Sequence, residues 1–289
     1  MSSLPVRESA SAQRAEHARD GSAAPPSPQY ARYLRGLRRK RWTVHLSRLG
    51  LLAVFLGLWE LAAAGGWVNP MLTSRPSRIY LSFVELAFGG ELLRHTGVTA
   101  LETVIGIVVS MALGLIVAVL FWWSTFASKV LEPYVVVLNA LPKVALGPIF
   151  YIWLGDRYSI YGMAVAISVI VTIIMIESGF REISRTKLKL MESLGATRAQ
   201  MLTMVLLPAS VPNLIAALKV NVGLTLVGVI MGEFLSSKAG LGYLITYGGQ
   251  VFQMNLVMVS IMMLALLSVV LYGLVNLLGR WALRRQHHD

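Results

Sequence analysis

Six long runs of apolar residues follow one another along the chain, and the polar residues collect between them. Each run is close to the roughly 20 residues that a helix needs to cross a bilayer. The runs cover approximately residues 44–67, 97–123, 130–154, 159–176, 212–235 and 256–278. Because a helix satisfies its own backbone hydrogen bonds, such runs are typical of membrane-spanning helices. The pattern predicts an all-α, polytopic membrane protein with about six transmembrane helices.

One connection between two of these runs, residues 184–212, is charged and more patterned than a simple link requires. Leu188, Met191 and Leu194 recur at helical spacing with charged residues between them, which predicts a short amphipathic helix. Gly195 interrupts the pattern where a helix would need a tight turn. We therefore expect a helix, a turn and a second helix at the membrane surface.

Two prolines, Pro208 and Pro212, close this connection. Proline lacks a backbone N–H and clashes with the preceding turn, so both are expected to prevent a smooth helix from continuing. The fifth apolar run is accordingly predicted to begin at about Pro212.

The composition also fits a membrane protein. Hydrophobic residues make up 56% of the chain and charged residues 14%, whereas roughly a quarter of the residues in soluble chains are charged. The absence of cysteine excludes disulfides, thiolate metal sites and cysteine nucleophiles. Lysine and arginine outnumber aspartate and glutamate by 26 to 14. These positive charges lie in patches beside the apolar runs, which suits orientation in a membrane better than binding of nucleic acid.

The distribution of lysine and arginine predicts the orientation. With a cytoplasmic amino terminus, most of the basic residues fall on inner segments, as the positive-inside rule requires. Both termini and residues 184–212 are then cytoplasmic. We divide the chain into a disordered basic tail (1–41), a first transmembrane helix with its external connection (42–96), a core (97–280) and a cytoplasmic tail (281–289).

Two features outside the core concern the membrane surface. The basic cluster near Arg38 is expected to contact anionic lipid headgroups. The external connection is expected to contain an interfacial helix at about residues 78–87. Membrane lipid is therefore a predicted partner, and nucleic acid is not.

The third apolar run is interrupted by Pro142, Gly147 and Pro148, so its backbone hydrogen-bond ladder is not expected to be continuous. Such backbone is tolerated in a membrane only where protein or a water-filled cavity covers it. Asn139 and Lys143 lie in the same break, and a lysine at membrane depth is costly. We interpret this segment as the lining of a path for solutes. The alternative is a kinked structural helix whose Lys143 extends to the interface.

Further charged residues within apolar runs include Glu102, Lys219 and Glu233. The lysines could attract an anion, and a glutamate could neutralise one of them; pairing is the commoner fate of such charges. The candidate path residues are therefore Asn139, Pro142, Lys143, Glu102, Lys219 and Glu233.

Several catalytic patterns are absent from the sequence. There is no Gly-x-x-x-x-Gly-Lys-Ser/Thr loop to hold the phosphates of ATP, no His-Glu-x-x-His and no Gly-x-Ser-x-Gly. His287 and His288 are not expected to bind a metal ion. We predict a non-catalytic protein with no cofactor or metal of its own, so another subunit must supply the energy for any active transport.

The charged connection resembles the signature loop of permeases of ABC importers, the binding-protein-dependent inner-membrane transport family. In that pattern a glycine, here Gly195, precedes nine residues and an Ile-x-Leu-Pro sequence, here ending at Pro208. The three residues Lys189-Leu190-Met191 depart from the usual Glu-Ala-Ala, with Glu192 one position further on. Residues 141–148 (LPKVALGP) and 232–245 (GEFLSSKAGLGYLI) are similar to permeases for nitrate, sulfonates and taurine.

The resemblance implies a bacterial inner-membrane assembly. Two copies of the chain would form the path, two ATP-binding subunits would dock on the loop and hold ATP and magnesium, and an external periplasmic or lipoprotein binding protein would deliver a small anionic solute such as a sulfonate, taurine or nitrate. The loop residues expected to couple the ATPase to the path are Lys189, Leu190, Met191, Glu192, Leu194, Gly195, Ala196, Thr197 and Pro208.

Two other functional classes remain open. A self-sufficient channel or ion-coupled carrier usually shows paired broken helices in two repeats, whereas only one clear break is found here. A membrane-bound enzyme or scaffold is the third class, and the missing catalytic patterns disfavour it.

Overall fold

The computed structural model describes residues 28–69 and 73–286, and it divides into two units, Met1–Trp59 and Glu60–Asp289. In the first unit the described residues belong to helix α2 (Pro28–Ala64), which continues to the start of the second unit. Its apolar part, Trp42–Ala64, is long enough to cross a membrane. Of the tail predicted at 1–41, residues 28–41 are helical and residues 1–27 lie outside the described residues.

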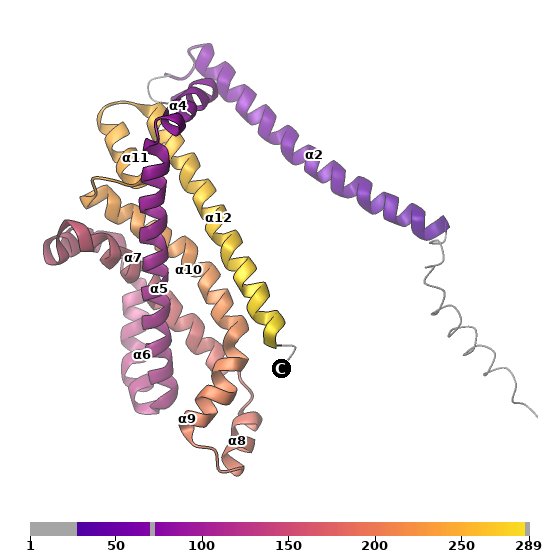
Figure 1. The fold of residues 1–289 in the computed structure, drawn as a ribbon, viewed down its shortest axis with the longest axis vertical. Helices are drawn as coiled ribbons and strands as arrows, with labels where there is room; N and C mark the ends of the chain where they lie inside the picture. The colour runs from indigo at the N-terminus through magenta and orange to yellow at the C-terminus, as the bar shows by residue number, and fades with distance from the viewer. Residues whose placement is uncertain (1–27, 70–72, 287–289) are drawn as a thin grey trace, which may run out of the picture. The chain divides into compact units, whose positions relative to one another are not determined.

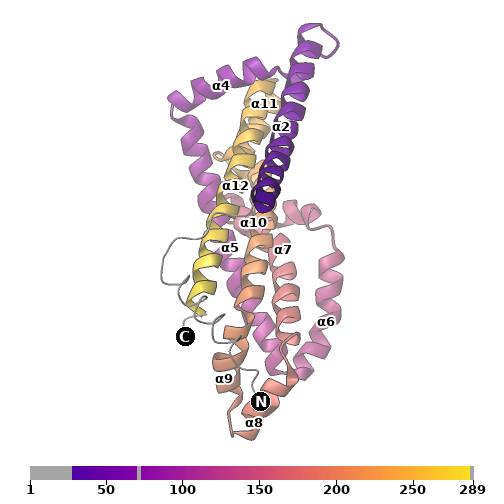
Figure 2. The same cartoon turned by 90° about the vertical axis from the view of Figure 1, so that its right-hand side faces the viewer.

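The described part of the second unit consists of helices and the short connections between them, and it contains no strand (Figure 1). Its helices in chain order are α4 (Pro76–Phe88), α5 (Glu91–Trp123), α6 (Thr125–Ala140), η1 (Lys143–Leu146), α7 (Gly147–Arg181), α8 (Arg185–Ser193), α9 (Arg198–Met201), η2 (Leu202–Leu206), α10 (Leu207–Ser236), α11 (Leu241–Gln250) and α12 (Met254–Gln286). α4 and α11 lie at one end of this bundle, and α8 and α9 lie at the other (Figures 1 and 2). α4 confirms the helix expected at about residues 78–87. The predicted tail begins within α12, and residues 287–289 lie outside the described residues.

Helices α5, α7 and α10 pack closely because small residues line their contacts. A Cβ atom added to Gly228 of α10 would lie 2.5 Å from the Cα atom of Ala164 on α7, so only glycine allows this approach. One turn further along α7, the hydroxyls of Ser110 and Ser168 are 2.6 Å apart and bridge α5 to α7. Interhelical packing of small and polar groups therefore holds the centre of the bundle.

Among the described residues, five helices are long and apolar enough to cross a membrane, so the expected count of six is approximate. The difference lies in the third apolar run, which is broken as predicted. α6 has 16 residues and ends at Ala140, the chain leaves the helix at Leu141 and Pro142, and η1 leads into α7. α7 bends at Gly155, whose φ of 72° is non-helical. The chain continues through η1 into α7, whose beginning lies beyond the end of α6 (Figures 1 and 2).

The expectation that Pro208 and Pro212 would stop a helix was wrong. Both residues lie in α10, which runs without interruption from Leu207 to Ser236. Pro208 lies in the first turn, where a missing N–H costs little. The five residues before α10 form a π-helix, η2. Its wider turn accommodates the backbone irregularity at Pro208.

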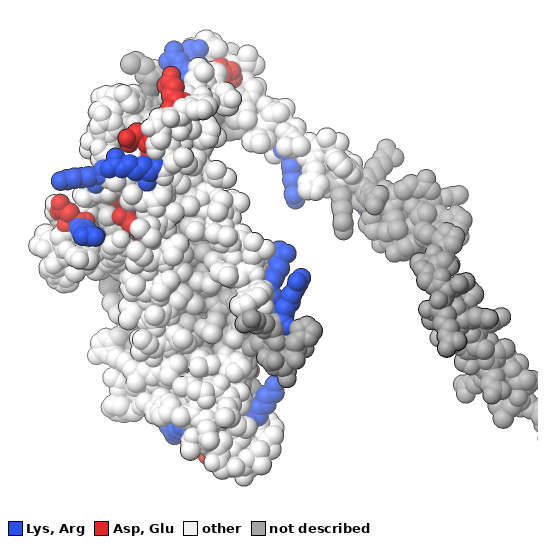
Figure 3. Space-filling view, viewed as in Figure 1, with Lys and Arg blue, Asp and Glu red and all other residues white. Residues whose placement is uncertain are grey.

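The charged side chains are unevenly distributed over the second unit. On the face shown in Figure 3 they gather near the α4 and α11 end, with others near the end of α12 and at the α8 and α9 end, and much of the remaining flank is uncharged. An uncharged flank of this kind is what a surface in contact with lipid requires.

Candidate functional site

The helix–turn–helix predicted in residues 184–212 is present, and its tip carries exposed apolar side chains. α8 presents Leu190 and Leu194, which are 61% and 74% exposed, while Met191 is half-buried. Leu190 and Leu194 are four residues apart and therefore share one face of the helix. Large exposed apolar side chains at the end of a charged loop are typical of a contact surface for another protein.

The turn after α8 has a conformation that favours glycine. Gly195 has φ of +77°, in the left-handed region, and the N–H of Ala196 donates to the Met191 carbonyl at 3.0 Å. These features are those of a glycine-terminated helix end. The Thr197 hydroxyl then accepts from the backbone N–H of Gln200, whose side chain accepts from the backbone N–H of Thr197. This reciprocal capping box starts α9.

The loop is tied to the bundle by contacts that join residues distant in the sequence. The Arg198 guanidinium donates to the carbonyl of Trp123, at the end of α5, at 2.7 Å. Leu206 is fully buried in a cluster that contains Ala118 of α5 and Ile176 of α7. Sequence reasoning did not identify Arg198 or Leu206 as a tether. A displacement of the loop must therefore act on α5, α7 and α10 together.

The candidate path residues do not form one hydrogen-bonded cluster. Lys143 lies in the break after α6, where its Nζ atom is 3.4 Å from the Asn139 carbonyl oxygen and 3.5 Å from the Asn139 Oδ1 atom. Pro142 is exposed in the same break. Lys219 is half-buried on α10, two residues from the buried Asn221. The hydrogen bonds of Lys143 are therefore to Asn139, within the same break.

Interior polar groups near Lys219 are paired with one another. Asn221 donates through Nδ2 to the Thr172 hydroxyl at 2.7 Å and accepts from the Thr225 hydroxyl at 2.8 Å. The hydrogen bond between Asn221 and Thr172 joins α10 to α7 in the core. Lys219 is the charged residue in this part of α10.

Glu233, near the end of α10, is buried with 1% of its surface exposed and contacts the start of α11. Its Oε1 atom accepts from the Thr99 hydroxyl at 2.7 Å, and its Oε2 atom accepts from the Gly242 N–H at 2.5 Å. A carboxylate at this position satisfies a free N–H of the first helical turn and complements the helix dipole. Glu233 therefore fastens α11 to α10.

Two residues of α5 complete this attachment. His95 accepts through Nδ1 from the Gly240 N–H at 2.9 Å, and the Thr99 hydroxyl accepts from the Leu241 N–H at 2.8 Å. We call His95, Thr99 and Glu233 the α11 anchor. His95 and Thr99 were not predicted, because a histidine just before an apolar run and a threonine within it carry no periodic signal.

Glu102 lies one turn from this anchor. Its side chain lies beside that of Glu233, and its Oε2 atom is buried without a hydrogen-bond partner. Apart from the local contact of Lys143 with Asn139, these two glutamates are the predicted path residues that the described structure brings together.

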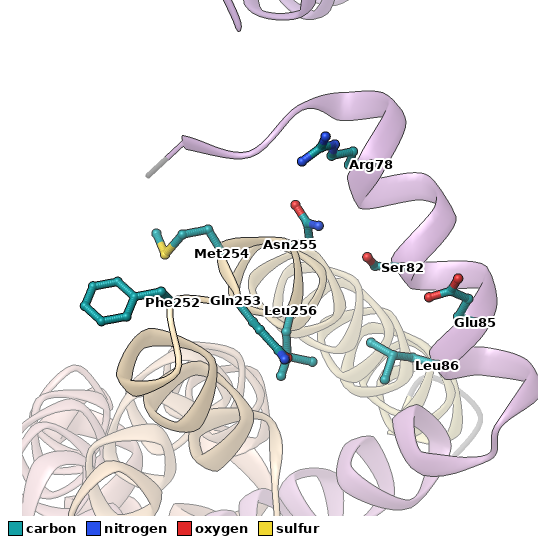
Figure 4. Close-up of a pocket in the computed structure, with 9 residues that line it drawn as sticks. All are labelled: Arg78, Ser82, Glu85, Leu86, Phe252, Gln253, Met254, Asn255 and Leu256. Carbon is teal, nitrogen blue, oxygen red and sulfur yellow. The ribbon is translucent and has the colours of Figure 1, made fainter. Parts of the chain in front are cut away.

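Two cavities open near the α4 and α11 end. The larger has a volume of about 570 Å³ and lies between α4 and the start of α12 (Figure 4); its lining residues are Arg78, Ser82, Glu85, Leu86, Phe252, Gln253, Met254, Asn255 and Leu256. The smaller, of about 290 Å³, is bounded by α5, α7 and the segment that follows α10. Both cavities combine apolar walls with charged groups.

The chain has relatives over most of its length. The sequence pattern of the family described as "Binding-protein-dependent transport system inner membrane component" matches residues 110–286. A putative aliphatic sulfonates transport permease protein, SsuC, of Bacillus subtilis is 26% identical over 91% of this chain and 95% of its own. A probable ABC transporter permease protein of Haemophilus influenzae is 30% identical over 83% of this chain and 96% of its own. The taurine transport system permease protein TauC of Escherichia coli is 23% identical over 86% of this chain and 93% of its own.

The fold also has a counterpart among solved structures. A chain of the MetNI methionine ABC transporter in an inward-facing conformation matches 68% of this chain and 98% of its own, with a TM-score of 0.60 and 17% sequence identity. At that identity the match describes the fold alone.

Proposed function

The chain belongs to the family of binding-protein-dependent transport system inner membrane components, and from this premise we propose that it couples ATP hydrolysis by a partner subunit to the import of a small organosulfonate. The observation that carries the proposal is the loop with exposed Leu190 and Leu194, which is tied to three long helices. The chain itself contains no phosphate-binding loop. The partner subunit therefore binds the ATP and magnesium.

Coupling proceeds through contact and rigid-body motion. Leu190 and Leu194 insert into a groove of the ATP-binding subunit, with Lys189 and Glu192 at its rim. When two such subunits close on ATP, they displace α8, and the left-handed turn at Gly195 keeps α8 at a fixed angle to α9. Because Arg198 and Leu206 tie the loop to the bundle, the long helices rotate between inward-open and outward-open states.

The path forms between two copies of the chain. α10 exposes Val220, Gly223 and Val227 along one stripe, with Lys219 beside it. This uncharged stripe suits contact with a second copy, and the lysine charge favours a sulfonate over a cation. Lys143, in the break after α6, supplies a second positive charge for the same solute.

An external binding protein delivers the solute at the α4 and α11 end. This end is placed outside because residues 184–212, with the ATP-binding subunit, are placed in the cytoplasm. Figure 4 shows Arg78 and Glu85 on the side of α4 that faces the cavity next to Asn255. Opposite charges at the rim of a cavity suit docking of a protein with complementary charges.

The test is reconstitution in liposomes. The chain with its ATP-binding subunit and binding protein should accumulate labelled taurine or an alkyl sulfonate only when ATP is supplied, and the chain alone should not transport. Uptake by the purified chain without ATP would instead establish the self-sufficient channel or carrier.

A further inference from the structure

Two arginines flank α8 in the sequence, and both contact the chain at or next to α6. Arg181 is the last residue of α7, and residues 182–184 connect it to α8. Arg198 is the first residue of α9, after the turn at Gly195. The first turns of α6 lie at the α8 and α9 end of the bundle in both views (Figures 1 and 2). A displacement of α8 therefore has a direct connection to α6.

Arg181 links the end of α7 to α6. Its Nη2 atom lies 2.6 Å from Oε1 of Glu177, one turn earlier on α7, and 3.4 Å from Oε1 of Glu132 on α6. Its Nε atom donates to the same Glu177 oxygen at 3.0 Å. Among the ion pairs within residues 28–69 and 73–286, the pair of Arg181 and Glu132 alone joins two different helices. Glu177 thus holds the guanidinium where it reaches α6.

Arg198 holds the chain at the point where α5 passes into α6. Its guanidinium donates to the carbonyl of Trp123, the last residue of α5, at 2.7 Å. The next residue, Ser124, accepts from the backbone N–H of Ala127 at 3.2 Å and so caps the start of α6. The chain is therefore held immediately before α6 and again at Glu132, about two turns into the helix.

α6 has few other constraints on its position. Each of its 16 residues is described and at least partly exposed. Pro133 lies inside the helix, next to Glu132. Because proline cannot donate to the carbonyl four residues earlier, a helix bends most easily at such a point. The far end of α6 leads at Leu141 into the break that carries Lys143. The bridge from Arg181 thus meets α6 at its weakest turn.

We propose that Arg181 is a positioning residue that makes α6 follow α8, through its bridge to Glu132. When the ATP-binding subunits displace α8, the end of α7 moves with it, and the guanidinium carries the Glu132 turn of α6 in the same direction. The movement reaches the break at Lys143 without passing through α10. This inference rests on the proposed function and names a route by which ATP closure changes the path.

The exposure of the pair sets the size of the expected effect. The side chains of Arg181 and Glu132 are 58% and 50% exposed. Loss of an exposed ion pair shifts the balance between two arrangements by at most about fivefold. The unfolding temperature should therefore hardly change, whereas α6 should follow α8 less often.

The first experiment measures the number of labelled taurine molecules imported per ATP hydrolysed, in proteoliposomes that contain the chain, its ATP-binding subunit and its binding protein. We expect this ratio to fall about two- to fivefold in Glu132→Gln and in Arg181→Gln, because hydrolysis continues while α6 follows less often. The variant with both changes should match Arg181→Gln, since the same bridge is lost in each. Lys129→Gln, which removes an exposed cation from α6, should keep the wild-type ratio.

A second experiment needs no solute. Because the chain has no cysteine, nitroxide labels can be attached through Val136→Cys on α6 and Thr186→Cys on α8. Labelled chains are diluted in unlabelled ones, so that each complex carries one labelled copy. The distance between the two labels should be the same with and without ATP in the otherwise wild-type chain. It should change with ATP when Glu132→Gln is added.

Three results would overturn the inference: an unchanged ratio in Glu132→Gln, additive losses in the double variant, or a label distance that responds to ATP equally with and without Glu132→Gln. A parallel loss of uptake and hydrolysis with a lower unfolding temperature would also overturn it, since Glu132 would then only stabilise the fold. Wild-type ATP-driven uptake together with any of these results retains the proposed function and rejects only this route. Absence of ATP-driven uptake in the wild type would count against the proposed function, and the label distances would still test the bridge.

Discussion

The turn at Gly195 offers a direct test of coupling because its backbone and side-chain requirements can be separated. A Cβ atom added at Gly195 would meet no atom within 4 Å, so space is open there. The φ of +77° is the constraint. A non-glycine residue in the left-handed region costs roughly 1–2 kcal/mol, and a β-branched residue is the least suited to it. Asparagine enters this region much more readily.

Gly195→Val should therefore reduce the population of the native turn by about 5–30-fold, the factor that corresponds to 1–2 kcal/mol. Gly195→Asn should leave it nearly intact. We expect ATP-dependent uptake in proteoliposomes to fall about tenfold in the valine variant and less than twofold in the asparagine variant. Both variants should insert and purify as the wild type does, because no atom of the bundle contacts the added side chain.

The assay records uptake and the stimulation of ATP hydrolysis by the binding protein in the same preparations. Equal defects in the two variants would show that side-chain bulk matters and that the turn geometry does not. Normal coupling in Gly195→Val would show that α8 need not be held at this angle, and the proposed transmission through the loop would then be wrong.

Four further substitutions test other parts of the protein. Leu194→Asp should reduce co-purification of the ATP-binding subunit more than tenfold, since it places a charge on the exposed apolar tip; unchanged co-purification would contradict docking at α8. Glu233→Ala should lower the thermal unfolding temperature, because it leaves the hydroxyl of Thr99 and an N–H of α11 without their acceptor at about 1–3 kcal/mol each; an unchanged temperature would mean that the anchor is dispensable. Gly228→Ala should destabilise the bundle by about 1–3 kcal/mol through overlap with the backbone of α7, measured by the same thermal assay. Arg78→Glu should reduce stimulation of ATPase activity by the binding protein while leaving unstimulated hydrolysis unchanged, and equal stimulation would exclude the α4 cavity as the docking site.

Local features of the fold were predictable from the sequence. The amphipathic helix before Gly195 and the break near Pro142 both follow from residue spacing and backbone chemistry within a few positions. Pro208 and Pro212 were misread because the effect of a proline depends on its context. Pro208 lies in the first turn of α10, directly after a π-helix that nothing in the local sequence identifies, and Pro212 lies inside α10.

The candidate site was less predictable because its contacts join distant residues. His95 and Thr99 contact Gly240 and Leu241, which follow more than 140 positions later. A single sequence gives no measure of which polar groups in different apolar runs meet. Glu233 was identified as an unusual buried charge, yet its hydrogen bonds to α11 depended on the arrangement of three helices.

The two ends of the bundle are connected by one continuous helical segment. η2 and α10 extend without interruption from Leu202, beside the coupling loop, to Ser236, next to the α11 anchor. At 1.5 Å per residue this segment is about 50 Å long. A helix of that length moves as a rigid body when its contacts on both sides are close, and the backbone contact at Gly228 is of that kind. A displacement of α8 is therefore expected to move the α11 anchor and the adjacent cavity by a similar amount. A flexible connection at either end of α10 would reduce the displacement that is transmitted.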